Sequence, residues 1–189
     1  MSAPFQRDRA GPEQHRELEF HRTRLDLLSG RERLACLGRI GDLTRLTGDF
    51  EEGEAALAEA MQLAAAEGDH TTRLVNRLRL AVLWHYKGSP GLARTTFRTL
   101  LSERDRDFRR GYADFVLQHL GKLLVELGEH EEAERILREA LALREEKGAE
   151  DLIASTRSAL DGLGERRSEA APGAPPTSAP EDSGEPGQG

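Results

Sequence analysis

The sequence predicts an all-α protein built from three stacked helix-turn-helix hairpins. Gly48, Gly88 and Gly128 recur at intervals of 40 residues, and the segments around them align without gaps. Each aligned segment has a helical apolar period before its glycine and another after it, with a short polar turn between them. A hairpin that recurs at a fixed interval cannot bury its apolar faces alone, so its neighbours in the stack must cover them.

One helix is expected before the first hairpin, over residues 12–29. Pro12 follows Gly11 and suits a first helical turn, and Ser29-Gly30 marks the end of the helix. By its length, this helix takes the place of the second helix of a preceding hairpin, so it is predicted to cap the stack. Residues 1–11 before it are predicted to be a disordered N-terminus.

The three hairpins are assigned to residues 31–69, 70–108 and 109–148. Small residues recur at matching sites in them: Gly41, Ala81 and Gly121 in the first helices, then Gly53, Ala93, Ala133, Ala60 and Ala140 in the second helices, with Leu100 as the exception. Leu57, Phe97 and Leu137 lie between these sites. A leucine would bury more apolar area than a glycine or alanine, so the small residues indicate that another helix passes too close for it. The two helices of each hairpin are therefore predicted to cross closely.

A last helix is expected over residues 150–164, as a cap on the third hairpin. Its apolar side chains Leu152, Ile153 and Leu163 are available for packing. Residues 168–189 hold five of the eight prolines, four net negative charges and no large apolar side chain. Residues 165–189 are therefore predicted to be a disordered acidic tail rich in Pro, Ala and Gly, and the repeat domain to span 12–164.

The glycine turn followed by small, large and small residues resembles the tetratricopeptide repeat (TPR) over about residues 31–146. The usual tryptophan site of that family holds Leu37, Arg77 and Leu117 here, and the terminal proline is absent. The interval of 40 residues exceeds the usual one of about 34 and is similar to the long form found in bacterial regulatory and signalling proteins. The resemblance implies a right-handed α-solenoid. Armadillo and HEAT repeats are the alternative, but their patterns lack this spacing.

No pattern of catalytic, metal-binding or phosphate-binding residues is present in the sequence, so a non-enzymatic protein without a cofactor is predicted. The net charge of −7 does not favour nucleic acid or anionic lipid as a partner. The Arg-rich stretch at residues 102–112 also contains three acidic residues, and it is interpreted as a charged turn between hairpins. A lone Cys36, with no signal peptide and no membrane span, predicts a cytoplasmic protein.

In the resembled family, the first helices of successive hairpins line a concave groove that receives a segment of another protein. Carried onto this sequence, the groove lining is Arg39, Asp42, Arg45, Arg79, Val82, His85, Tyr86, Phe115, Gln118, His119, Lys122 and Glu126. Four fixed positive charges face two negative ones there. An acidic or amphipathic protein segment is therefore the predicted ligand, with Tyr86 and Phe115 as apolar anchors and Arg39, Arg79 and Lys122 setting charge selectivity.

Other interaction functions stay open at this point. The chain resembles sensory domains that bind a peptide or small effector, in which case it would act in trans, because no output domain fits within it. It also resembles dedicated chaperones that hold one client protein. The sequence does not distinguish these from a scaffold, and self-association is possible.

Overall fold

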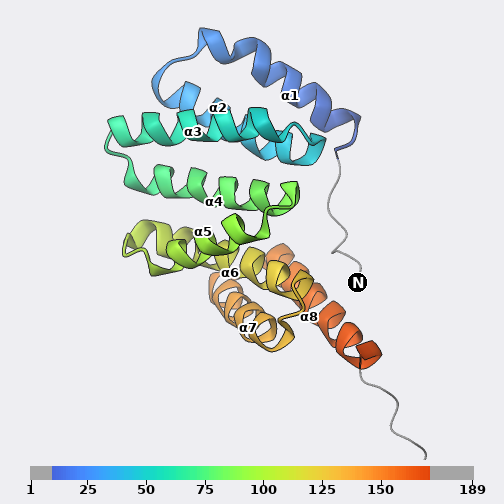
Figure 1. The fold of residues 1–189 in the computed structure, drawn as a ribbon. Helices are drawn as coiled ribbons and strands as arrows, with labels where there is room; N and C mark the ends of the chain where they lie inside the picture. Colours follow the sequence, from blue (N-terminus) through green and yellow to red (C-terminus); the bar gives the residue numbers. More distant parts are fainter. Residues whose placement is uncertain (1–9, 171–189) are drawn as a thin grey trace, which may run out of the picture.

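The computed structural model describes residues 10–170, with side chains described as far as Glu165. This part of the chain contains only helices and connecting turns (Figure 1). The helices are α1 (Pro12–Arg24), the 3-10 helix η1 (Leu25–Leu27), α2 (Gly30–Thr47), α3 (Phe50–Ala66), α4 (His70–Lys87), α5 (Pro90–Ser102), α6 (Arg106–Glu126), α7 (His130–Lys147) and α8 (Glu150–Ala170).

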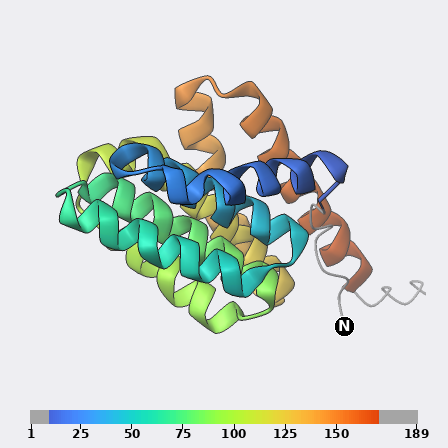
Figure 2. The ribbon, with the colours of Figure 1, turned by 90° about the horizontal axis from the view of Figure 1, so that it is seen from above.

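The helices form a solenoid, as the sequence predicts. Three hairpins, α2–α3, α4–α5 and α6–α7, stack in chain order (Figure 1). The first helices α2, α4 and α6 contact one another along the stack, while α1 packs on α2 and α8 packs on α7. Viewed down the stack, α1 lies over the first hairpin and α8 extends outward beyond the third (Figure 2). The fold is therefore all-α, with a flanking helix at each end.

Each hairpin turns at a glycine with left-handed backbone geometry. Gly48, Gly88 and Gly128 have φ angles of 92°, 85° and 78°. Residues with a Cβ adopt this region only at an energetic cost, and glycine ends a helix there without it. The Gly48 N–H donates to the Thr44 carbonyl oxygen at 2.9 Å, which satisfies one of the last carbonyls of α2.

The small residues lie where the two helices of a hairpin cross. A Cβ added at Gly41 would come within 2.5 Å of Leu57 Cδ2, and one added at Gly121 within 2.6 Å of Leu137 Cδ2. Ala133 and Ala140 have no exposed surface. The close crossing predicted from the spacing is thus present, and the large residue of each second helix occupies the space that the small residue leaves.

Enlarging Ala133 is expected to destabilise the fold. Ala133→Leu overfills a site with no exposed surface, and such overpacking costs about 1–3 kcal/mol. The melting temperature should fall by about 2–4 °C for each kcal/mol in a chain of this size. Ala142→Leu, at an exposed site on the same helix, is the control, and equal melting temperatures for the two variants would contradict the close crossing.

Several helix ends differ from the sequence prediction. Residues 12–29 form an α-helix followed by a 3-10 turn rather than one helix. The last helix continues to Ala170, so residues 165–170, predicted to belong to the tail, are helical. At the other end, the Ala10 N–H donates to the Leu46 carbonyl oxygen at 3.2 Å, so residues 10 and 11 are held against α2 instead of fraying. The rest of the predicted tail and N-terminus, 171–189 and 1–9, lies outside the described residues.

The connection between the second and third hairpins is also shifted. α5 ends at Ser102, and α6 begins at Arg106, before the expected boundary at residue 109. Asp105 fixes this start because its carboxylate accepts a hydrogen bond from the Phe108 N–H at 2.7 Å, as an N-cap does. The Arg-rich stretch is therefore a short loop and the first turns of a helix.

Candidate protein-binding groove

The twelve predicted groove residues all lie on α2, α4 and α6, the three first helices that run side by side. We call the surface they form the first-helix face. Three of them do not line an open surface: Val82, His85 and Gln118 are only 6%, 5% and 3% exposed. This corrects the prediction for these residues. The cause is the packing of α4 against α6, which encloses side chains that helical periodicity alone placed at the surface.

Arg39 is already paired with a carboxylate from α1. Its Nε and Nη2 donate to the two oxygens of Glu17, at 2.6 and 2.7 Å. This bond, helped by the positive charge of Arg39, lowers the pKa of Glu17. Glu17 lies on α1, beside the first-helix face, and sequence reasoning missed it because nothing in the sequence indicates how α1 lies over α2. The pair removes one of the four positive charges counted in the groove.

Arg79 is also paired within the face. Its Nε lies 3.1 Å from Asp42 Oδ2, and its Nη1 donates to Asn76 Oδ1 at 3.1 Å. Gly38 makes room for this arrangement, because a Cβ there would come within 2.6 Å of Arg79 Nη1. Arg79 thus joins α4 to α2, and its charge is balanced by Asp42.

Arg45 is held by an aromatic ring. Its guanidinium lies over the ring of Tyr86, 4.5 Å from the centroid. No carboxylate of residues 10–165 forms an ion pair with it. A cation over an aromatic face is fixed in position while its N–H groups stay available at the ring edge. Arg45 therefore combines a preset position with unused hydrogen-bonding capacity.

The contact between α4 and α6 holds buried polar groups. His85 Nε2 lies 3.0 Å from Glu126 Oε2 and links the two helices. His85 Nδ1 and both amide atoms of Gln118 have no hydrogen-bond partner among the described residues. A buried polar atom without a partner costs about 1–3 kcal/mol, so this part of the face carries hydrogen-bonding capacity that the fold leaves unused.

His119 faces the neighbouring hairpin. Its ring stacks on Phe97 of α5, with centroids 6.2 Å apart and an interplanar angle of 12°. Burial, together with the nearby positive charges of Arg45 and Lys122, lowers the pKa of His119 well below its ordinary value. This half-buried side chain therefore packs between hairpins with its ring neutral, and its place in the groove lining stays a prediction.

The lowered pKa of His119 predicts an acid-sensitive contribution to stability. The folded chain keeps this ring neutral, whereas the unfolded chain protonates it near the ordinary value of about 6.5. Below that pH the unfolded state binds more protons, so the free energy of unfolding should fall as the pH falls. Urea unfolding at pH 7 and at about pH 5.5 measures this effect. Between these pH values the free energy of unfolding should fall less for His119→Gln than for the unchanged chain, and equal falls would contradict the neutral ring.

Phe115 is partly covered by the third hairpin. The Arg144 guanidinium lies 5.4 Å from the centroid of its ring, and Tyr112 packs beside it with centroids 6.2 Å apart. Arg144 is only 2% exposed and pairs with the fully buried Asp114, Nε to Oδ2 at 3.1 Å. This predicted anchor therefore presents only part of its surface to a partner.

The sequence contains a signal for the buried pair of Asp114 and Arg144. Asp114 stands where the repeats place Leu34 and Leu74, so a carboxylate interrupts an apolar position of the 40-residue alignment. A charge at an apolar site requires a partner, which Arg144 supplies. Neither residue was a predicted site residue.

Two features of other functions are absent from the described part of the chain. No group of three or more His, Cys, Asp or Glu side chains within it could hold a metal ion. No helix in the same residues is long and apolar enough to cross a membrane.

Comparison with known proteins gives a family match for the third hairpin. Residues 116–147, which comprise the second half of α6 and all of α7, match the sequence profile described as the tetratricopeptide repeat. The third hairpin is thus similar to a tetratricopeptide repeat. A search of curated proteins gives no significant match to the chain.

Solved structures extend the TPR likeness to most of the fold. A kinesin light chain protein of Podosopora anserina with nearly identical TPR-like repeats is 14% identical, with a TM-score of 0.59, over 84% of this chain and 81% of its own. A single-substitution variant of it gives a TM-score of 0.61, over 84% of this chain and 80% of its own. At this identity the likeness establishes the fold. TPR-like repeats generally mediate protein–protein interactions, and they are generally non-catalytic.

Proposed function

We propose that the chain is a non-enzymatic docking module that binds an acidic or amphipathic segment of another protein along the first-helix face. The proposal rests on the fold, which generally serves protein interaction, and on the charges of α2, α4 and α6. Within this face, the proposed contact region centres on Arg45 and Tyr86 and includes Lys122 of α6.

The environment of Arg45 is the observation that supports an acidic ligand. Arg39 and Arg79 already bind Glu17 and Asp42, so a ligand carboxylate would have to displace an existing partner at either of them. Arg45 has an aromatic ring below it and no carboxylate among residues 10–165. A ligand carboxylate can approach it without that competition, which moves the charge selectivity from Arg39 and Arg79 to Arg45.

The buried polar atoms support a ligand that carries backbone amides. The Gln118 side chain can donate and accept at once, and neither function is used within the described residues. A peptide main chain offers a carbonyl oxygen and an N–H at the spacing of one residue, so it can use both. Because Gln118 is only 3% exposed, we expect its side chain to change rotamer when the ligand binds.

The test is a charge reversal at Arg45 in the native host. A photo-crosslinking amino acid at position 86 should capture a protein partner, and mass spectrometry should place the crosslink in a segment that contains Asp or Glu. Arg45→Glu in the same chain should abolish that crosslink, because it turns an available cation into a repelling charge.

Two controls separate the charge claim from a general loss of structure. Arg16→Glu changes an exposed arginine on α1 and should leave the crosslink unchanged. Arg39→Glu should weaken it less than Arg45→Glu, since Arg39 is already paired. Equal recovery from Arg45→Glu and the unchanged chain would refute the acidic ligand, and a crosslink yield of zero in all chains would refute this face as the docking surface.

A further inference from the structure

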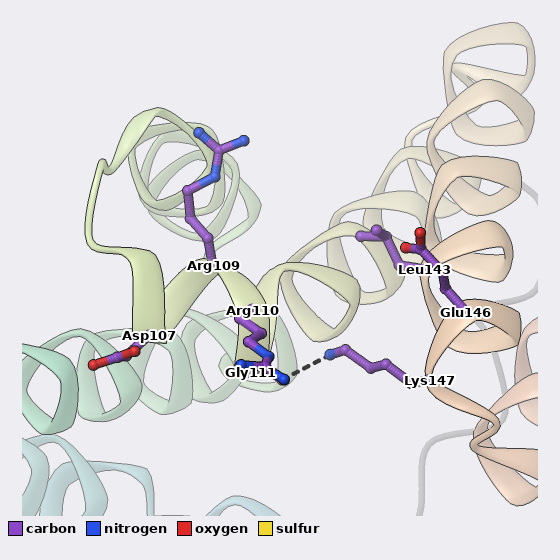
Figure 3. A pocket seen from close by; sticks show the side chains of 7 residues that line it. All are labelled: Asp107, Arg109, Arg110, Gly111, Leu143, Glu146 and Lys147. Atoms are coloured by element: carbon purple, nitrogen blue, oxygen red, sulfur yellow. Dashed lines mark hydrogen bonds between the residues drawn. The ribbon is translucent and has the colours of Figure 1, made fainter.

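A pocket lies away from the first-helix face, where the second and third hairpins join. It has a volume of about 750 Å³, and it is lined by Asp107, Arg109, Arg110, Gly111, Leu143, Glu146 and Lys147 (Figure 3). The first four of these residues belong to the start of α6 and the last three to the end of α7. We call this space the junction pocket.

The pocket exists because the helix boundary at this junction is displaced. α3 ends at Ala66, which corresponds to residue 106 one repeat later, but α5 stops at Ser102. α4 begins at His70, which corresponds to residue 110, but α6 begins at Arg106. One helical turn has therefore moved from α5 to α6, so Arg109 belongs to α6 rather than to the connection between the hairpins.

Two cations of the pocket are not balanced by the described residues. Arg109 and Arg110 are exposed, and neither forms an ion pair or hydrogen bond to a side chain in residues 10–165. Lys147 is engaged, because its Nζ donates to the Gly111 carbonyl oxygen at 2.9 Å (Figure 3). The same Nζ also pairs with Asp114. Asp107 and Glu146 also line the pocket, so the cationic part is the strip formed by Arg109 and Arg110.

A second hollow adjoins this strip. It has a volume of about 660 Å³, and it shares Arg109, Arg110 and Leu143 with the junction pocket. Its remaining lining mixes apolar side chains of α5, α6 and α7 with the charged side chains of Arg98, Glu132, Arg135 and Glu139. Arg98 and Arg135 both pair with Glu132, so the guanidinium groups that a docking carboxylate can use are those of Arg109 and Arg110.

The chain itself contains an acidic segment. Residues 171–189 hold Glu181, Asp182 and Glu185, no basic residue and five prolines. The first ten of these residues, 171–180, contain four of the prolines. Its charge is opposite to that of the arginine strip.

The segment is long enough for the distance it would have to cover. α8 begins at Glu150, just after Lys147 of the pocket, and its 21 residues carry the chain about 31 Å away, at about 1.5 Å per residue. Ten residues separate Ala170 from Glu181, and a chain of ten residues can span at most about 33–36 Å. The chain length therefore allows Glu181 and Asp182 to reach the junction pocket.

We propose that the acidic stretch 181–185 docks in cis on Arg109 and Arg110 at the junction pocket. Single exposed ion pairs are weak, but a tethered segment acts at an effective concentration in the millimolar range, which favours docking without new apolar contacts. The docked state should therefore be populated at low salt and released at high salt.

A spin label in the segment tests this in the full chain. Cys36 is only 4% exposed and burial raises the pKa of its thiol, so a cysteine introduced by Ser183→Cys can be labelled selectively. In the isotope-labelled chain, the amide signals of Arg109, Arg110 and Gly111 should lose intensity beside the oxidised label. About 0.5 M NaCl should restore them, because the Debye length then falls to a few ångström.

Charge variants and mixing complete the test. The double variant Arg109→Glu, Arg110→Glu should abolish the intensity loss, and so should neutralising the three acidic residues of the segment. The control variant Arg16→Glu, Arg31→Glu should leave the intensity loss unchanged, because Arg16 lies on α1 and Arg31 on α2, away from the pocket. Signals that are equally strong with oxidised and reduced label overturn the proposal. The proposal is also overturned if spin-labelled chains mixed with isotope-labelled chains that carry no spin label give the same intensity loss. That result would show that the segment docks on a second copy of the chain.

Discussion

Replacing Asp114 by alanine is expected to lower the free energy of unfolding by about 3–5 kcal/mol, because it leaves a buried arginine without its counter-charge. Asp114 and Arg144 are 0% and 2% exposed, and they join α6 to α7 at 3.1 Å. The same guanidinium donates to Thr156 Oγ1 at 2.6 Å and to the Leu152 carbonyl oxygen at 3.0 Å. Arg144 therefore links α8 to the third hairpin, in addition to the apolar packing of Ala159 and Leu163.

Urea unfolding measures this effect. Asp107→Ala, which removes an exposed aspartate of the same helix, should change the free energy by no more than about 0.5 kcal/mol. Asp114→Leu combined with Arg144→Leu should be much less harmful than Asp114→Ala, because it removes both charges and keeps the volume apolar. A loss below about 1 kcal/mol for Asp114→Ala would show that water reaches Arg144 and that the pair is not sealed.

Truncating Phe97 is the second large change we expect. Phe97 has no exposed surface and fills the crossing of α4 and α5, between the small residues Ala93 and Ala81. Phe→Ala in a packed core costs about 3–5 kcal/mol, because the cavity left behind collapses only partly. The stacked ring of His119 would lose its partner as well.

The repeat itself supplies the matched control for this residue. Leu57 and Leu137 occupy the equivalent sites of the other hairpins, so Phe97→Leu should be tolerated with a loss of less than about 1.5 kcal/mol. The two variants should separate by at least about 2 kcal/mol in urea unfolding. If Phe97→Ala costs no more than Phe97→Leu, the second hairpin does not close around this side chain.

The fold could be predicted because its causes are local and repeated. Gly48 and its equivalents end helices through a backbone geometry that glycine adopts easily, and the small residues at 41, 121 and 133 record a close contact directly in their size. Both signals recur at the same interval, so each hairpin supports the assignment of the others.

The site was predicted less well because its chemistry depends on contacts between hairpins. Helical periodicity places Val82, His85 and Gln118 on one face of a helix, but it does not give the distance to the next first helix, which buries them. The partner of Arg39 lies on α1, and no spacing in the sequence relates that helix to α2. The partner of Arg45 lies on α4, which the repeat places beside α2 without indicating which side chains meet. The sequence therefore favoured Arg39 and Arg79 as the residues that set charge selectivity, although both are paired within the fold and Arg45 is not paired with a carboxylate of residues 10–165.

The displaced junction between α5 and α6 shows an intermediate case. Its position differs from the 40-residue rule, yet a local signal is present, since Asp105 is a good N-cap and stands three residues before Phe108. Giving this cap more weight than the repeat interval would have placed the helix start at Arg106.

The central claim is that the row of first helices, and not the second helices, receives another protein. Hydrogen–deuterium exchange of the chain with and without its captured partner tests it most directly. We expect slower exchange in α2, α4 and α6 around Arg45, Tyr86 and Lys122, with α3, α5 and α7 unchanged. Protection confined to α3, α5 and α7, with the first helices unaffected, would contradict it.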